Sequence, residues 1–292
     1  MNKLPMEKRA QVLSLLVEGN SLRAASRIAD VSYNTVCKLF AEAGRVAGEY
    51  QDKTLRDLTC KRLQLDEIWS FVYAKEKNVG LAKAAPDKAG DAWTWVAIDA
   101  DTKLVPSWRI GDRSSETALA FMTDLASRLR NRVQITTDGH KAYLEAIEDA
   151  FGADVDYAML VKVYGPAPEG NTRRYSPAEC VGAHKHRIEG NPDARHVSTS
   201  FAERQNLTMR MSIRRFTRLT NAFSKKLENH ALAVALHYFH YNFCRIHKTL
   251  RVTPAMAAGV VDRVMDMSDL AALIAAQEAP AAKRGPYKKR AA

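Results

Sequence analysis

One acidic residue, Glu203, lies among arginines and side-chain amides in segment 197–216, VSTSFAERQNLTMRMSIRRF. The spacing of its residues predicts a helix, because at about 100° per residue the polar positions share one face. That face carries Glu203, Asn206, Arg210 and Arg214. The opposite face is apolar and is expected to meet the core through Phe201, Met209 and Phe216. An amphipathic surface helix with merely solvated charges gives the same pattern, so Glu203 becomes meaningful only beside other acids.

Two further acids occupy predicted strands. Segment 63–74, LQLDEIWSFVYA, is mostly apolar and aromatic, which predicts a buried strand bearing Asp66. Side chains alternate along a strand, so Asp66 and Glu67 are expected on opposite faces, with only one of them in a given site. Segment 132–137, RVQITT, predicts a short strand that runs directly into Asp138. In an α/β sheet, ligands often bind at the carboxyl ends of strands, which makes Asp138 a candidate site residue.

The remaining periodic segments supply the elements that must position these acids. Segments 92–100 and 103–111 predict two strands joined by a turn, in which Asp99 and Asp101 are turn formers. Helices are expected at 114–130, with Ser114 as the cap, and at 139–151, followed by a strand at 157–164. The order is three strands, helix, strand, helix, strand, and then the helix of Glu203. A long helix at 223–247 is expected to pack against the sheet, and a short helix is expected at 266–277.

The segment 5–50 divides into three short helical patterns. They cover 6–19, then 21–29 with Ser21 as a possible cap, and a third helix after a turn at 30–32. This arrangement resembles the helix-turn-helix of bacterial DNA-binding proteins, whose last helix enters the major groove. The resemblance implies base contacts by early residues of the third helix, namely Ser32, Tyr33, Asn34, Thr35 and Lys38. A three-helix packing module without DNA contact is the alternative.

Length, composition and charge bound the class of protein. The 292 residues suggest about two domains, and 46% hydrophobic residues suffice for a sizeable core. A formal net charge of +11 favours a polyanionic partner such as nucleic acid. The cysteines are far apart, lack a CxxC pair and follow no secretory leader, which favours a reducing cytosol. No apolar run has the length of a membrane span, so no membrane partner is expected.

The ordered set Asp66, Asp138 and Glu203 resembles the ribonuclease H-like domain of the DDE transposase and integrase superfamily, and most closely bacterial insertion-sequence transposases. The resemblance extends through HVSTSFAERQNLTMR, with Arg210 at the basic position seven residues after the Glu. It also includes YNFCRIHKTLRVTPAMAAG, whose closing pattern falls on Asn242, Arg245, His247, Leu250, Thr253 and Pro254. The match covers roughly residues 63–259. One departure is the 65-residue gap between Asp138 and Glu203, lengthened by segment 165–195, which is expected to form a loop or hairpin near the site.

The resemblance implies an α/β fold class with a domain plan. A helix-turn-helix domain at 1–50 and a linker at 51–62 precede a ribonuclease H-like domain at 63–220, with a mixed five-stranded sheet, flanking helices and the insertion at 165–195. A helical extension at 221–278 follows. The tail 279–292 is basic and poor in apolar residues, so it is expected to be disordered and to touch the DNA backbone nonspecifically.

The chemistry implied by the resemblance is metal-dependent cleavage and strand transfer of DNA. Two Mg²⁺ ions about 4 Å apart, with Mn²⁺ as a substitute, stabilise the attacking and leaving oxygens of the phosphodiester. Asp66 bridges both ions, Asp138 completes the shell of one, and Glu203 that of the other. Arg210 and Arg214 contact DNA, Arg210 through a phosphate. The implied partners are duplex DNA at the element's terminal repeats and at the target, bound by a homo-oligomer at the nucleoid in a bacterial cytoplasm.

Three alternatives use the same residues differently. A DNA-binding regulator derived from a transposase keeps the fold without activity, and a ribonuclease H-like nuclease cuts without joining. A zinc site is the third, because four possible ligands lie within 17 positions: Cys180, His184, His186 and His196. The absence of paired CxxC knuckles disfavours zinc, and histidines in a basic loop serve equally as phosphate partners.

Overall fold

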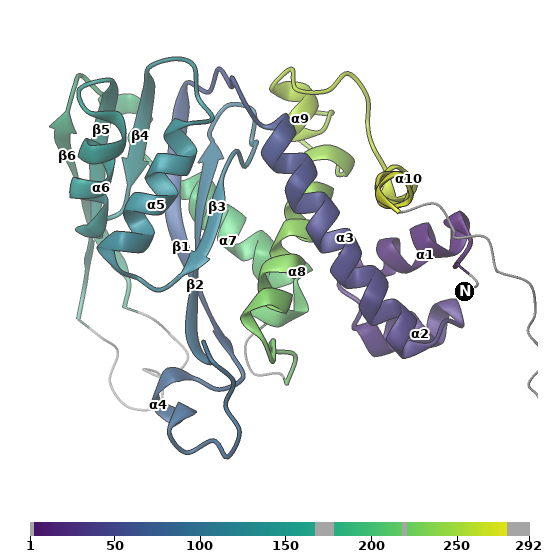
Figure 1. Cartoon of the computed structure of the whole chain (residues 1–292). Coiled ribbons are helices and arrows are strands. Elements are labelled where there is room, and N and C mark those ends of the chain that lie inside the picture. The colour runs from purple at the N-terminus through teal and green to yellow at the C-terminus, as the bar shows by residue number, and fades with distance from the viewer. Residues whose placement is uncertain (1–2, 167–177, 218–220, 279–292) are drawn as a thin grey trace, which may run out of the picture.

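The computed structural model describes residues 3–166, 178–217 and 221–278, which build a mixed α/β fold around one six-stranded sheet. The strand order is β3-β2-β1-β4-β5-β6 (Figure 1). The strands are β1 (Arg62–Val72), β2 (Gly90–Asp99), β3 (Trp108–Gly111), β4 (Val133–Thr137), β5 (Val155–Tyr164) and β6 (Cys180–Glu189). Strands β1, β2 and β3 are antiparallel neighbours, whereas β4 is parallel to β1 and β5 is parallel to β4. This arrangement is compatible with a ribonuclease H-like fold.

The sixth strand corrects the expectation of five. It lies within segment 165–195, which was expected to form a loop or hairpin, and it pairs antiparallel with β5. Residues 167–177, between its two strands, lie outside the described part of the chain. A sheet edge has unpaired backbone groups that accept another strand, which is how an apparent loop insertion became part of the sheet.

Helices cover both faces of the sheet. Helices α5 (Ser115–Ala126) and α6 (Ala142–Phe151) pack together on one face, where Trp95 of β2 contacts Phe121 of α5 and Tyr143 of α6. Helix α7 (Ser200–Ser212) packs against β1 and β2. A short helix, α4 (Glu76–Val79), follows β1. The sheet in Figure 1 therefore lies between α7 and the α5–α6 pair, with β2 in contact with helices on both sides.

Helix α7 ends earlier than its sequence pattern predicts. It ends at Ser212, Ile213 is extended, and Arg214 lies in a separate 3₁₀ turn, η3 (Arg214–Phe216). Arg214 therefore does not share the helical face of Glu203. The predicted apolar face is buried at Met209 and Phe216, whereas Phe201 is 37% exposed.

The expected strand at 103–111 is formed only in its last four residues. The backbone of Val105 pairs with the side chain of Asn242 instead, with both its N–H and its carbonyl 3.0 Å from the amide. Pro106 has no N–H to donate to a neighbouring strand. At the preceding turn, Asp99 accepts from the backbone of Asp101 and Thr102, as its predicted role of turn former requires.

The N-terminal unit consists of α1 (Met6–Val17), α2 (Leu22–Ala29) and α3 (Tyr33–Thr54). The Ser21 side chain caps α2 by accepting from the backbone N–H of Ala24. Helix α3 continues four residues past position 50 into the segment expected to be a linker, and Leu55 and Leu58 beyond it are buried. The described residues of this unit thus belong to the same hydrophobic core as the sheet.

Helix α8 (Leu227–Phe239), extended by the π-helical turn η4 (His240–Cys244), lies along α3. It was expected to span 223–247 and to pack against the sheet. It does contact β3, through stacking of Tyr238 on Trp108, but α3 is its main neighbour. Gly44 of α3 permits the close approach, because an added Cβ would lie 2.6 Å from the Cβ of Leu232.

The C-terminal helices return to the N-terminal unit. Helix α9 (Pro254–Ala257) is capped by Thr253, and α10 (Met267–Gln277) by Asp266, close to the expected start at 266. Helix α10 packs on α1 (Figure 1). Glu278, at its end, pairs with Arg9 at 2.7 Å. The expected basic tail at 279–292 lies outside the described residues. None of the helices in the described ranges combines the length and apolarity needed to cross a membrane. All four cysteines are free thiols.

Candidate metal centre

Asp66, Asp138 and Glu203 line one cavity of about 810 Å³. Asp66 is in the middle of β1, Asp138 directly follows β4, and Glu203 is in the first turn of α7. Because β1 and β4 are parallel neighbours, Asp66 and Asp138 lie close together, beyond the last paired residues of the two strands. The three acids singled out from the sequence thus meet in space although they come from three elements.

Hydrogen bonds orient the two aspartates. Asp66 accepts the backbone N–H of Glu67 at 2.9 Å on one carboxylate oxygen and the Asn206 side-chain amide at 2.8 Å on the other. Asn206 was expected on the same helical face as Glu203, and it does reach this site. Asp138 accepts the backbone N–H of His140 at 2.9 Å. These donors hold both carboxylates in defined directions toward the cavity.

Glu67 joins the cluster, contrary to the expectation that only one of the two adjacent acids can face a given site. Asp66, Glu67 and Asp138 each offer one oxygen, and these oxygens lie within 4.8 Å of one another. The pairing of β1 with β4 stops at Gln64, so Asp138 lies where β1 has no neighbour on that side. A carboxylate in that position approaches residues from both faces of β1.

Glu67 is the most enclosed acid of the cluster. Its side chain is 1% exposed, and its Oε2 accepts from the Arg113 guanidinium at 3.0 Å. Its Oε1 is buried and makes no hydrogen bond of regular geometry among the described residues, although the nearby Tyr143 hydroxyl counteracts part of the effect of burial on the pKa of Glu67. A buried carboxylate oxygen without a partner is costly, and a bound cation would offset that cost. The available signal in the sequence was an acid inside an apolar strand directly beside Asp66.

Electrostatics within the cluster favour bound positive charge. Burial raises the pKa of Asp66 to about 7, and the negative charges of Glu67, Asp138 and Glu203 add to this effect. Burial likewise raises the pKa of Glu67. A bound cation would stabilise the ionised forms of these carboxylates and so lower their pKa values again.

Glu203 belongs to the cavity but not to the close group of three oxygens. Its Oε1 contacts Lys162 of β5 and accepts from the Thr199 hydroxyl at 2.6 Å. The Lys162 ammonium therefore neutralises the acid that was expected to complete a metal site. Two further cations, Arg113 and Lys141, also line the cavity. The walls around the acids are thus suited to an anionic group such as a phosphate.

The residues expected to contact DNA occupy two regions. In the first two turns of α3, Tyr33, Asn34 and Lys38 are exposed. Ser32 caps this helix by accepting the Thr35 backbone N–H at 3.3 Å, and the two hydroxyls lie 2.8 Å apart. In the second region, Arg210 is half-buried on α7, and Arg214 is exposed in η3.

The possible zinc ligands do not form a site among the described residues. Cys180, His184 and His186 are exposed on β6, with the two imidazole rings 6.2 Å apart. His196 contacts Arg62, far along the chain. Within the described ranges, the group of metal-ligating side chains that does come together is the acidic one. Its hard oxygen donors suit a divalent cation such as Mg²⁺ better than zinc.

Comparisons with known proteins give a faint likeness. No family model matches the chain, and no curated protein matches it. Among solved structures it is similar to a pre-cleavage Mos1 transpososome, with 13% identity, coverage of 54% of this chain and 60% of that chain, and a TM-score of 0.21. It is also similar to the Mos1 strand transfer complex, with 11% identity, coverage of 81% and 78%, and a TM-score of 0.25.

Proposed function

We propose that this chain is a DDE-type DNA transposase, which cuts phosphodiester bonds at the ends of an insertion element and joins those ends to target DNA. The observation that carries the proposal is the meeting of Asp66, Asp138 and Glu203 in one cavity. Carboxylates repel one another, so three acids from two strands and a helix that line one cavity indicate a site for positive charge. The same three residues carry the sequence resemblance.

The donor set fits divalent cations. We assign Asp66 as a ligand shared by two Mg²⁺ ions and Asp138 and Glu203 as ligands that complete one shell each, with Mn²⁺ as a substitute. Glu67 joins this set because its oxygen lies within 4.8 Å of those of Asp66 and Asp138. When bound, such ions stabilise charge on the attacking and leaving oxygens of a phosphoryl transfer.

Other side chains of the cavity orient the carboxylates and attract an anionic substrate. Asn206 holds Asp66 in place, and Lys162 restrains Glu203 at the cavity wall. Arg113 and Lys141 add positive charge to a cavity that must accept a phosphodiester. Their positive charges offset part of the repulsion between the carboxylates and an anionic substrate.

The N-terminal unit is proposed to be a helix-turn-helix that binds the element's ends. Three residues join α2 to α3, and Asp30 in this turn has a left-handed φ of 50°. The first two turns of α3 expose Tyr33, Asn34 and Lys38, which we assign to base edges. Ser32 and Thr35 are retained as contacts, although their hydroxyls also stabilise the start of the helix. The partner is double-stranded DNA, bound by a homo-oligomer.

The test is incubation of the purified protein with labelled element ends, target DNA and Mg²⁺ or Mn²⁺. We expect cleaved ends and joined products from the wild type, and neither from Asp138→Asn, which should still bind DNA. Asp99→Asn, at a turn outside the cavity, is the control and should keep most activity. Cleavage without joining would indicate a nuclease, and binding without cleavage a silent regulator. Near wild-type turnover by a folded Asp138→Asn variant would overturn the assignment.

A separate measurement tests the assignment of Glu67. Calorimetric titration with Mg²⁺ should show weaker binding to Glu67→Gln, because one carboxylate oxygen of the cluster loses its charge. Arg113→Gln removes the partner of Glu67 but no metal ligand, and serves as the matched variant. Unchanged Mg²⁺ affinity in Glu67→Gln would limit Glu67 to its structural pair with Arg113.

A further inference from the structure

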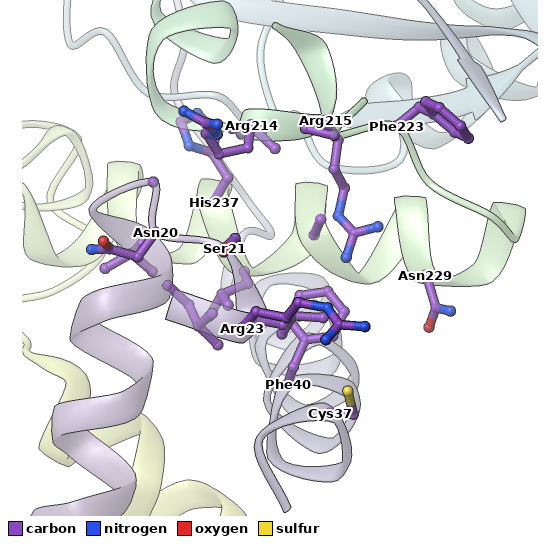
Figure 2. A pocket seen from close by; sticks show the side chains of 18 of the residues that line it. Asn20, Ser21, Arg23, Cys37, Phe40, Arg214, Arg215, Phe223, Asn229 and His237 are labelled. Carbon is purple, nitrogen blue, oxygen red and sulfur yellow. The ribbon is translucent and has the colours of Figure 1, made fainter. Parts of the chain in front are cut away.

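A second cavity, of about 400 Å³, lies between the N-terminal unit and the segment that follows α7. Figure 2 shows Arg23, Cys37 and Phe40 approaching it from the N-terminal helices. Arg214 and Arg215 approach it from the opposite side. The cavity is therefore formed only when the two parts of the chain pack together.

The polar character of this cavity is cationic. Four basic side chains line it, Arg23, Arg214, Arg215 and Lys225, and no acidic residue is among the described residues that line it. The Arg23 guanidinium lies over the Tyr33 ring, with 5.1 Å from its central carbon to the ring centroid. The Arg215 guanidinium lies over Phe40 at the same distance. Both guanidiniums are thus held in place by aromatic rings, with donors left for a ligand.

These four cations lack the carboxylate partners that nine of the twenty described arginines have. Within the described ranges, none of the four has a carboxylate within salt-bridge distance. Elsewhere such pairs are formed by Arg9, Arg45, Arg56, Arg62, Arg113, Arg128, Arg132, Arg195 and Arg263. The chain therefore concentrates unneutralised positive charge in a concave site.

Burial makes an anionic ligand more favourable there. Arg215 donates to the Ser224 hydroxyl at 2.8 Å, a neutral partner, and burial lowers the pKa of Arg215. His237, which is 6% exposed, also lines the cavity, and its Nε2 has no hydrogen-bonding partner in the described part of the chain. Buried charges are normally paired, so a guanidinium without a counter-ion indicates the place of a bound anion.

We propose that this cavity binds a backbone phosphate of duplex DNA, so that one DNA segment is held jointly by the N-terminal unit and the segment after α7. The inference rests on the proposed function and adds a contact that joins its two parts. Tyr33, at the start of the proposed reading helix, lines the cavity, and so does Ser212 at the end of α7. From Glu203 to Ser212 the helix rises roughly 14 Å, at 1.5 Å per residue. This is less than half of one turn of B-DNA, which is about 34 Å. The separation of the two cavities along α7 is therefore within the length of one duplex turn.

The first test is the salt dependence of DNA binding, measured by fluorescence anisotropy in EDTA so that metal chemistry plays no part. Loss of one phosphate contact in Arg214→Ala should lower the magnitude of the slope of log K against log salt by about one unit. Lys77→Ala removes an equal charge from exposed helix α4 and should change the slope little. Arg215→Lys keeps the buried charge and guards against a folding defect. Equal slopes for wild type and a folded Arg214→Ala would overturn the inference.

The second test uses Cys37, a partly exposed free thiol in the cavity wall, as a probe. Duplex DNA should slow alkylation of Cys37, followed by peptide mass spectrometry. Exposed Cys180, which pairs with Tyr164 at the metal cavity, reports DNA contact at that other site in the same experiment. Sodium phosphate at the same ionic strength as sodium chloride distinguishes the source of the phosphate. Protection of Cys37 by free phosphate but not by DNA would overturn the DNA assignment. If the wild type binds no DNA at all, the proposed function fails. If it binds DNA without protecting Cys37, only this inference fails.

Discussion

Replacing Asp66 by Asn should stabilise the metal-free protein at neutral pH. Asp66 lies beside Glu67, Asp138 and Glu203, whose charges oppose its ionisation. The substitution removes that charge and keeps the shape of the side chain. The neighbouring Asn206 can adapt, because its Oδ1 is buried without a hydrogen-bonding partner in the described residues. If the Asn206 amide rotates, its Oδ1 can accept a hydrogen bond from the side-chain amide that replaces the Asp66 carboxylate. The substitution therefore does not place two N–H donors against each other.

The magnitude follows from the pKa of Asp66, which burial raises from 3.8 to about 7. A carboxyl group whose pKa is higher in the folded state favours folding in its protonated form. Its stabilising contribution is fully present below about pH 4 and is lost as the pH rises through 7. Each pKa unit corresponds to about 1.4 kcal/mol, so the wild type loses roughly 4 kcal/mol across this range through Asp66. Asp66→Asn should therefore match the wild type near pH 4 and exceed its stability by roughly 2 to 4 kcal/mol at pH 8.

The assay is urea unfolding in EDTA at several pH values, repeated with Mg²⁺ at pH 8. Mg²⁺ should stabilise the wild type, because a ligand of the folded state shifts the unfolding equilibrium, and should stabilise Asp66→Asn much less. Asp99→Asn alters a buried turn carboxylate outside the cluster and should keep the Mg²⁺ response. A variant that is less stable than the wild type at pH 8 in EDTA, yet still responds fully to Mg²⁺, would refute the argument that these acids form a metal centre.

Three further predictions concern the packing that supports the two cavities. Gly44→Ala should lower the free energy of unfolding by about 1 to 3 kcal/mol, because its methyl group would overlap α8. Gly48→Ala on the same helix meets only ordinary contacts and should raise the free energy of unfolding by about 0.5 to 1 kcal/mol. Equal effects of the two substitutions in urea unfolding would contradict the close approach of α3 and α8. Asn242→Ala should lower the free energy of unfolding by about 2 to 4 kcal/mol in the same assay, since it leaves the N–H and carbonyl of Val105 unpaired. A change below about 0.5 kcal/mol would show that these two hydrogen bonds do not stabilise the fold. Burial lowers the pKa of His230 to about 3. The neutral imidazole therefore contributes stability that is present above pH 6.5 and is lost at about 1.4 kcal/mol per pH unit as the pH falls toward 3. His230→Gln should flatten the acid side of a plot of the free energy of unfolding against pH, and an unchanged plot would assign acid unfolding to other groups.

Local patterns determined much of the site before any packing was considered. An acid within an apolar run placed Asp66 on a buried strand, and an acid directly after RVQITT placed Asp138 at a strand end. The 3.6-residue period placed Asn206 on the same side of α7 as Glu203. These features depend on backbone geometry over a few residues, so they can be inferred from sequence alone. Capping residues such as Ser21 and Ser114 were recognisable for the same reason.

Contacts between distant residues were decided only by the tertiary structure. Glu67 enters the acidic cluster because the pairing of β4 with β1 stops short of it, and Lys162 reaches Glu203 because β5 lies beside the site. Segment 180–189 became a strand only because β5 offered an unpaired edge, which no local pattern reports. The cationic cavity likewise needs Arg23 and Arg215, 192 positions apart in the chain, to face each other across two packed units. Local periodicity defines the face on which a side chain lies, but the groups opposite that face are chosen by the packing of the whole chain.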